Sequence, residues 1–253
     1  MCGIAAIVER DPARVTPDAD IAGMVQALLH RGPDETGRVC LPGAALGMRR
    51  LAIVDLATGQ QPISNETGDV HIVANGEIYN FLELRHELEA RGHRFKTRSS
   101  DIESLLHAWE EWGDGFPAKV RGMFAAVIWD ARTRTLFAAR DRAGEKPLYW
   151  ASTERGLLLG SELKALLTRP ELPRTLDLES LDQFLTFEYV IAPRTMLQGV
   201  QALPAGSWLR WRDGAITVER YWDPATIPVR AWTDDAAAEA VREALQRAVT
   251  SQL

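Results

Sequence analysis

The sequence predicts an α+β protein in which antiparallel sheets are covered by helices. The expected elements run as strand, helix, hairpin, two helices and then a series of strands. The regular alternation of strands and helices that builds a parallel sheet is missing from this order. With 46% hydrophobic and 25% charged residues among 253, the chain has the composition of a globular protein with a sizeable core.

The first half of the chain divides into short apolar runs separated by turn residues. Residues 3–8 are continuously apolar, which is typical of a buried strand. Apolar residues at helical spacing predict a helix over 21–30, because residues 31–35 then break the pattern. Two apolar runs split by a Pro-Gly pair predict a hairpin within 39–56. The other expected elements are a strand at 70–74, ended by Asn75 and Gly76, and helices at 79–90 and 101–112.

The second half is rich in strand-like runs. The expected strands lie at 123–129, 135–139, 148–151, 157–160, 207–211 and 215–221. Helices are expected at 161–167, 178–187 and 234–249. The last of these helices is amphipathic, with Val241, Leu245 and Val249 on one side.

Charge and cysteine content exclude several classes of protein. The formal net charge is −6, whereas general nucleic-acid and membrane-surface binders present a basic face. The longest apolar runs are far shorter than the roughly 18 residues of a membrane-spanning helix. The apolar N-terminus lacks the basic segment that begins a signal peptide. Two cysteines are too few for a disulfide framework, so a cytoplasmic location is expected.

Cys2 is the first candidate catalytic residue. Removal of Met1, which is expected when the second residue is small, leaves a chain that begins with cysteine. The thiol then stands beside a free α-amine, a base whose reference pKa of about 7.7–8 suits proton transfer at neutral pH. Two other interpretations stay open: a small buried residue that begins a strand, and a papain-type pair of a cysteine with a histidine.

Three further positions carry groups that suit catalysis or binding. The Asn75 amide and the Gly76 N–H can stabilise an oxyanion, although an Asn-Gly pair is also an ordinary turn. Arg50 can clamp a carboxylate, or lie solvated at a sheet edge. Asp101 can bind an ammonium group, or cap a helix. The sequence has no phosphate-binding loop and no Cys/His cluster with zinc spacing, so neither cofactor nor metal is expected in this chain.

Several segments, taken in order, resemble the glutaminase domain of the class II glutamine amidotransferases. These segments lie at 1–4, 30–34, 50–55, 75–80 and 100–101. Further segments resemble the glutamine-hydrolysing asparagine synthetases, namely 122–125, 139–149, 161–166 and 189–195. The resemblance covers essentially the whole chain.

The resemblance implies an N-terminal-nucleophile hydrolase fold, a four-layer α-β-β-α sandwich. The implied activity is hydrolysis of glutamine to glutamate and ammonia through a thioester on Cys2, with the Cys2 α-amine as base. Asn75 and Gly76 are then expected to form the oxyanion hole. The implied substrate-binding residues are Arg50 for the α-carboxylate, Asp101 and Glu77 for the ammonium group, and Leu51, Ile53 and Val54 as the pocket lining.

The resemblance also implies a second domain. Residues 1–205 are expected to form the glutaminase domain, and 206–253 the lead-in to an α/β synthetase domain before which the chain stops. In the family that domain activates aspartate with ATP and Mg²⁺, and its Ser-Gly-Gly-x-Asp-Ser loop is absent here. The chain is therefore expected to hydrolyse glutamine without making asparagine, with a synthetase domain in cis or trans and a homodimer as candidate partners.

The sequence departs from the family pattern at Ala143, Glu145 and Ile102, and it leaves alternatives open. Ala143 and Glu145 replace a Phe and an Ile that are common there, which bears on the interface with the second domain. One alternative is an amidotransferase that acts on another carboxylate, and another is a non-catalytic scaffold module. The presence of Cys2, Asn75 and Asp101 favours catalysis.

Overall fold

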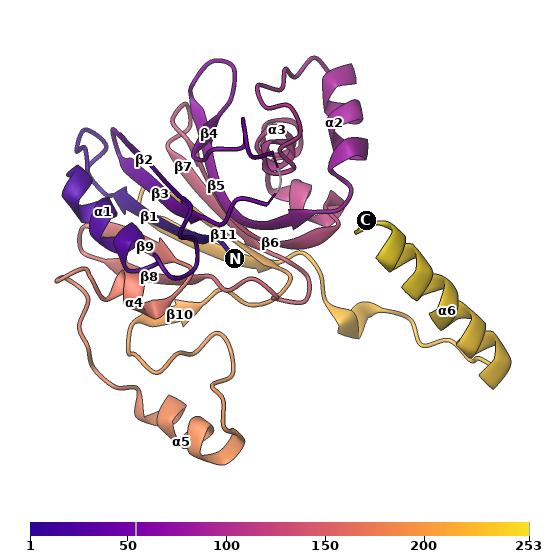
Figure 1. Cartoon of the computed structure of the whole chain (residues 1–253). Coiled ribbons are helices and arrows are strands. Elements are labelled where there is room, and N and C mark those ends of the chain that lie inside the picture. The colour runs from indigo at the N-terminus through magenta and orange to yellow at the C-terminus, as the bar shows by residue number, and fades with distance from the viewer. Residues whose placement is uncertain (54, 253) are drawn as a thin grey trace.

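Two antiparallel sheets pack face to face in the computed structural model, which describes residues 1–53 and 55–252 (Figure 1). The first sheet has the order β10-β8-β9-β1-β3-β2. Its strands are β1 (Gly3–Glu9), β2 (Glu35–Leu41), β3 (Ala44–Arg50), β8 (Tyr149–Thr153), β9 (Gly156–Gly160) and β10 (Val200–Ala202). The second has the order β12-β11-β7-β6-β5-β4. Its strands are β4 (Ile63–Ser64), β5 (Val70–Ile78), β6 (Gly122–Asp130), β7 (Thr135–Arg140), β11 (Ser207–Arg212) and β12 (Ala215–Arg220).

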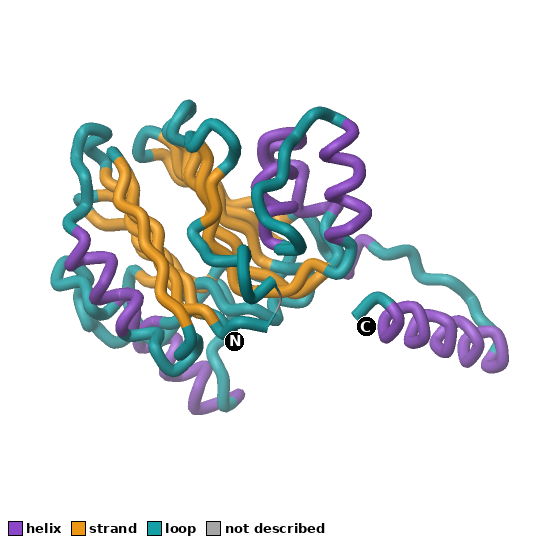
Figure 2. The backbone as a smooth tube through the Cα atoms, turned by 45° about the horizontal axis from the view of Figure 1, so that its top comes forward, coloured by secondary structure: helices purple, strands orange, loops and turns teal. Residues whose placement is uncertain are grey.

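Helices cover the outer face of each sheet (Figure 2). The first sheet is covered by α1 (Asp18–Gln26) and α4 (Leu163–Leu166). The second is covered by α2 (Phe81–Ala90), α3 (Ile102–Trp112) and the 3₁₀ helix η1 (Gly113–Lys119). Helix α5 (Leu178–Phe187), the 3₁₀ turn η2 (Pro224–Thr226) and α6 (Asp234–Thr250) extend away from this sandwich. The predicted four-layer α-β-β-α architecture is therefore confirmed.

The continuous apolar run at the start of the chain is explained by burial on both faces of β1. Ile4, Ala6 and Val8 face the space between the sheets, where they join Val73 and Val127 of the second sheet. Alternate residues of the same strand face the other way and pack beneath α1. A strand buried on both faces needs apolar residues at every position, not only at alternate ones.

Strand β5 is longer than the sequence predicts. The expected strand ended at residue 74, with Asn75 and Gly76 as a turn, but β5 continues to Ile78 along β6. A Cβ on Gly76 would lie 2.2 Å from the Met123 carbonyl oxygen of β6. Gly76 therefore lets two strands approach closely, and the turn interpretation is wrong.

The sandwich also ends later than expected. Strand β11 pairs with β7 on one side and β12 on the other, and its Trp208, Leu209 and Trp211 are buried. A domain boundary after residue 205 would cut these strands from the second sheet. The second sheet therefore continues to Arg220, beyond the boundary predicted at 205.

Beyond β12 the chain is exposed. Val241, Leu245 and Val249 of α6 face solvent, each more than half exposed. No helix in the described part of the chain is both long and apolar enough to span a bilayer.

Candidate active site

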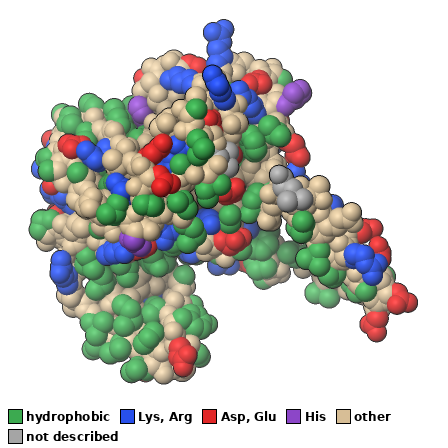
Figure 3. All heavy atoms as spheres, in the orientation of Figure 1, with side chains coloured by type: hydrophobic (Ala, Val, Ile, Leu, Met, Phe, Trp, Pro, Cys, Tyr) green, Lys and Arg blue, Asp and Glu red, His purple; other side chains and the backbone are tan. Residues whose placement is uncertain are grey.

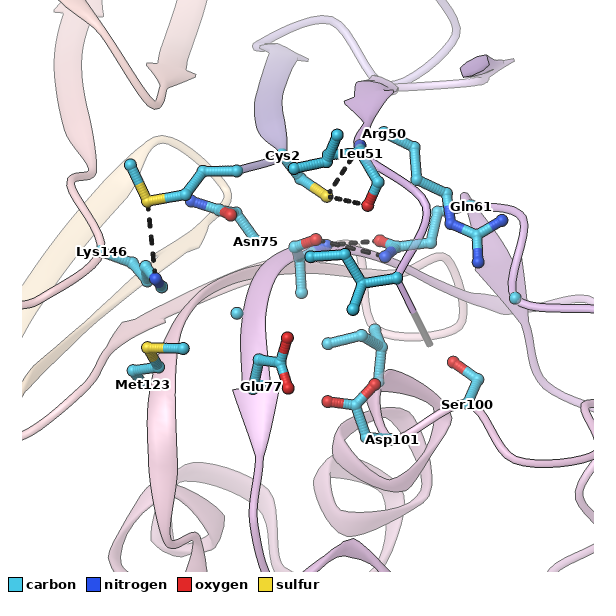
Figure 4. A pocket seen from close by; sticks show the side chains of 16 residues that line it. Cys2, Arg50, Leu51, Gln61, Asn75, Glu77, Ser100, Asp101, Met123 and Lys146 are labelled. Atoms are coloured by element: carbon cyan, nitrogen blue, oxygen red, sulfur yellow. Dashed lines mark hydrogen bonds between the residues drawn. The ribbon is translucent and has the colours of Figure 1, made fainter. Parts of the chain in front are cut away.

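A pocket opens where strand ends from both sheets meet (Figure 4). Its cavity volume is about 190 Å³. Of the residues predicted from the sequence, those described in the structure all line it: Cys2, Arg50, Leu51, Ile53, Asn75, Gly76, Glu77 and Asp101. Val54, the remaining predicted residue, lies outside the described residues. These residues come from four separate parts of the chain and are thus brought together.

Cys2 lies immediately before β1 with its thiol against the backbone of Leu51. Its Sγ accepts the Leu51 N–H at 3.4 Å and donates to the Leu51 carbonyl at 3.7 Å. Burial raises the pKa of the Cys2 thiol, although the Leu51 backbone and the charges of Arg50 and Arg31 act in the opposite direction. A thiol that stays protonated at neutral pH needs a base before it can act as a nucleophile.

The backbone of Cys2 is anchored by Arg31, which is partly buried. Arg31 Nε donates to the Cys2 carbonyl at 2.8 Å, and its Nη1 pairs with Glu162 at 2.9 Å. Burial alone would raise the pKa of Glu162, but bonds from Arg31, His30 and Lys164 lower that pKa to about 2. The carboxylate therefore stays charged and holds Arg31 in place. No histidine among the described residues hydrogen-bonds to Cys2, so a papain-type pair gains no support.

Asn75 presents an amide that the fold leaves without a partner. Its side chain is 2% exposed, and Nδ2 makes no hydrogen bond with any described residue. A buried donor without a partner costs about 1–3 kcal/mol. Because Asn75 lines the pocket beside Cys2, a ligand oxygen in the pocket can take up this donor (Figure 4).

Arg50 is buried at the end of β3, on the opposite side of Cys2 from Lys146 (Figure 4). Its Nη1 donates to Glu35 Oε2 at 2.7 Å, and its Nη2 donates to the Asp55 carbonyl at 2.8 Å. These contacts fix the plane of the guanidinium group, which lines the pocket. The alternative of a solvated edge residue is wrong.

Two carboxylates, Asp101 and Glu77, lie together at the other end of the pocket (Figure 4). Asp101 occupies the N-cap position of α3 but makes no capping bond with its side chain; instead its Oδ2 accepts the Ile78 N–H at 2.8 Å. Burial, together with the charge of Glu77, raises the pKa of Asp101 to about 6. Such a pair of carboxylates suits a cationic group of a ligand.

The loop at 51–53 is shaped by the segment at 30–34. Asp34 Oδ2 accepts the Ala52 N–H at 2.9 Å, and a Cβ on Gly32 would meet the Arg49 carbonyl carbon at 2.4 Å. The motif at 30–34 therefore supports the pocket wall from behind.

Sequence reasoning missed several residues that line the pocket, among them Gln61, Ser100, Met123 and Lys146. Gln61 bonds both backbone groups of Ala74, at 2.7 and 3.2 Å, and so fixes β5 just before Asn75. No local pattern distinguishes Gln61. Lys146 stood in a segment that carried the family resemblance, but that resemblance assigned it no role.

A second polar cluster lies away from this pocket. Glu66, His93 and His107 bring possible metal-ligand atoms within 4.8 Å of one another. His107, however, is fully buried between Glu110, at 3.2 Å, and Glu103, at 3.6 Å. A protonated imidazole between two carboxylates accounts for this cluster without a metal.

Comparisons with known proteins agree with this arrangement. A family model described as a glutamine amidotransferase domain matches residues 1–222. Asparagine synthetase [glutamine-hydrolyzing] 1 of Bacillus subtilis (strain 168) is 37% identical over 98% of the chain and 39% of its own length. Asparagine synthetase [glutamine-hydrolyzing] 3 of the same organism is 35% identical over 100% of the chain and 41% of its length. The chain thus spans about two-fifths of these relatives.

Solved structures share the fold at low sequence identity. The glutamine phosphoribosylpyrophosphate amidotransferase of B. subtilis, complexed with ADP and GMP, matches 88% of this chain and 49% of its own with a TM-score of 0.58 and 18% identity. A structure described as the allosteric regulatory enzyme of purine biosynthesis matches the same shares with a TM-score of 0.60 and 18% identity. The family model, which matches most of the chain, and the two curated relatives establish that the chain belongs to the glutamine amidotransferase domain family.

Proposed function

We propose that this chain hydrolyses glutamine to glutamate and ammonia through a thioester on Cys2. The observation that carries the proposal is the unpartnered amide of Asn75 in the same pocket as the Cys2 thiol. The pocket has an arginine at one end and a pair of carboxylates at the other, which matches the two charged groups of an α-amino acid.

The substrate is held through the two charged groups on its α-carbon. The guanidinium group of Arg50, fixed by Glu35 and Asp55, binds the α-carboxylate. Asp101 and Glu77 bind the α-ammonium group. The side-chain amide of glutamine then extends toward Cys2 and Asn75.

Removal of Met1 frees the α-amine of Cys2, which takes the proton of its own thiol. The thiolate sulfur attacks the amide carbon, and the oxyanion is stabilised by Asn75 Nδ2 and the Gly76 N–H. The carbon–nitrogen bond then breaks, and the proton on the α-amine passes to the leaving nitrogen as ammonia departs. Water attacks the thioester next, and glutamate is released with regeneration of the thiol.

The ammonia is expected to serve a synthetase domain, in cis or trans, because the chain matches about two-fifths of the asparagine synthetases. ATP and Mg²⁺ belong to that domain in this proposal. Exposed apolar side chains gather on and beside α5, at the bottom of Figure 3, and offer a surface for it. They are Leu178, Phe184, Leu185, Phe187, Tyr189 and Ile191. The acceptor of ammonia, a homodimer and a cytoplasmic location stay predictions.

Glutamate release by the chain with Met1 removed tests the proposal. Cys2→Ala is expected to abolish hydrolysis, and a diazo-ketone analogue of glutamine is expected to add to Cys2 in the wild type. Cys40→Ala is the matched control, because Cys40 lies on β2 outside the pocket and its loss should leave hydrolysis intact. Hydrolysis by the Cys2→Ala variant at the wild-type rate, or none by the wild type, would contradict the proposal.

A further inference from the structure

Lys146 places a buried positive charge in the same pocket as the nucleophile. The residue is 7% exposed and lies in the loop between β7 and β8, with its side chain lining the pocket. Its backbone is fixed on both sides: the N–H donates to Asp141 Oδ2 at 3.0 Å, and the carbonyl accepts Arg140 Nε at 2.7 Å. The position of the side chain is therefore set by the fold.

The ammonium group of Lys146 has an unusual partner. Its hydrogen bond goes to Met1 Sδ at 3.6 Å, and no carboxylate of the described residues pairs with it. A thioether is a weak acceptor, whereas buried lysines are normally paired with a carboxylate. Packing alone does not explain a buried charge held in this way.

Met1 is the residue that the proposed function removes. Its loss takes away the partner of Lys146 and creates a free α-amine on Cys2, one peptide bond from where Met1 stood. Figure 4 shows the Lys146 side chain at one side of the pocket, at a level between Cys2 above and Glu77 below. The new amine and the Lys146 ammonium group then line the same cavity.

We propose that Lys146 is a positioning residue for the catalytic base, whose positive charge keeps the Cys2 α-amine neutral and able to accept the thiol proton. The inference rests on the proposed function. Two cations in a partly buried site repel each other, so protonation of the amine in the resting enzyme is disfavoured. Lys146 itself gains and loses no proton during the reaction.

The other charged groups around Cys2 include cations, which disfavour protonation of its α-amine, and anions, which favour it. Arg31, which follows α1, lies 2.8 Å from the Cys2 carbonyl, and Arg50 enters from β3. Glu77 from β5 and Asp101 before α3 carry negative charge at the far end of the pocket. Both arginines are held by carbonyl or carboxylate oxygens, whereas the Lys146 ammonium group bonds only the Met1 thioether among the residues that the structure describes.

The test compares wild type, Lys146→Met and Lys146→Arg, each with Met1 removed. The methionine variant has a chain of similar length without the charge, and the arginine variant keeps the charge. The pH dependence of kcat/KM for glutamine is measured for all three. Loss of the charge is expected to move the acid limb of the profile up by about one pH unit, while Lys146→Arg keeps the wild-type limb. An unmoved limb in an active Lys146→Met variant would overturn the inference.

A second measurement stays decisive if Lys146→Met does not fold or if glutamine is not the substrate. The Cys2 α-amine of the wild-type chain is titrated by NMR after ¹⁵N-cysteine labelling. The midpoint is expected below the reference range of about 7.7–8. A midpoint within or above that range contradicts the role of Lys146. Absence of glutamine hydrolysis with a lowered midpoint would contradict the proposed function alone.

Discussion

At the scale of single residues, the pocket combines groups that are fixed with one that is left unpaired. Arg50 and Asp101 both make hydrogen bonds to the protein that set their orientation. Asn75 Nδ2 makes none with the described residues, although it is buried. The fold thus bears the cost of one unsatisfied donor at the point where an oxyanion is expected to form.

Asn75→Ala is therefore expected to reduce kcat by about 10²–10³-fold with little change in stability. The Nδ2 donor that it removes has no hydrogen-bond partner among the described residues. Asn80→Ala is the matched control, since the Asn80 side chain bonds the backbone at Lys119 and Arg121. This substitution should lower the melting temperature without the loss in kcat. Steady-state kinetics and thermal unfolding separate the two. A variant at Asn75 that melts early but turns over normally would contradict the assigned role.

Asp101 predicts a pH dependence for substrate binding. Because its pKa is raised to about 6, the carboxylate is mostly protonated at pH 5, and KM for glutamine is expected to rise about tenfold between pH 7 and pH 5. Asp101→Asn is expected to raise KM by about 10–100-fold at pH 7 and to abolish that dependence.

Ionisation of Asp101 also lowers the stability of the protein when no glutamine is bound. An acid whose pKa is higher in the folded state loses stability as it ionises, here as the pH rises from about 4 through 6. Asp101→Asn keeps an oxygen for the Ile78 N–H and removes that charge, so its melting temperature at pH 7 should not fall. A lower melting temperature would indicate that Asp101 serves the fold.

At the scale of elements, α3 is held to its neighbours by a buried charge network. His107 is fully buried between Glu103 and Glu110, and Asn65 near β4 donates to Glu110 at 2.8 Å. Burial acts to lower the pKa of His107, but bonds to these two carboxylates raise that pKa to about 9. The carboxylates of Glu103 and Glu110, which bind Thr97 and Asn65 outside the helix, are therefore paired with a charged imidazole within α3.

This network predicts a loss of stability at alkaline pH. A histidine whose pKa is raised on folding contributes stability that is fully present below about 6.5 and is lost as the pH rises through about 9. The contribution is on the order of 3 kcal/mol. The melting temperature of His107→Gln is expected to be lower at pH 6 and to approach wild type near pH 10. An equal difference at both pH values would contradict the charged state.

At the scale of the whole molecule, the sandwich and the segment beyond it differ in what holds them. Strands β11 and β12 complete the second sheet. The chain also packs closely at Trp222, since a Cβ on Gly206 would lie 2.5 Å from the Trp222 carbonyl oxygen. Beyond this point α6 has no buried residue. The packed unit therefore ends near residue 222.

Two truncations test that boundary. A chain that ends at residue 222 is expected to keep the melting temperature and glutamine hydrolysis of the 253-residue chain. A chain that ends at residue 205 loses three buried side chains of β11 and is expected not to fold, since each costs about 2–5 kcal/mol when its site is emptied. Circular dichroism and glutamate release measure both. Stable folding of the shorter chain would restore the boundary predicted from the sequence.

The layers of the fold and the identity of the pocket residues could be predicted from the sequence alone. Apolar runs mark strands because a strand between two layers excludes water on both faces, as in β1. The resemblance carried by Cys2, Arg50, Asn75 and Asp101 placed these residues in one site, and the structure brings them to one pocket.

Only the tertiary structure decided the features that depend on neighbours far away in the chain. The sequence predicted a turn at Gly76. A glycine is needed there because β6 approaches closely, and β6 lies more than forty residues further along the chain. The sequence pattern assigned β11 to another domain because its partner strand, β7, is distant in the sequence. The burial of Lys146 beside Met1 joins residues that lie 145 positions apart in the chain. Local patterns determine elements, whereas the contacts between distant elements determine charge, burial and boundary, and those contacts exist only in the folded chain.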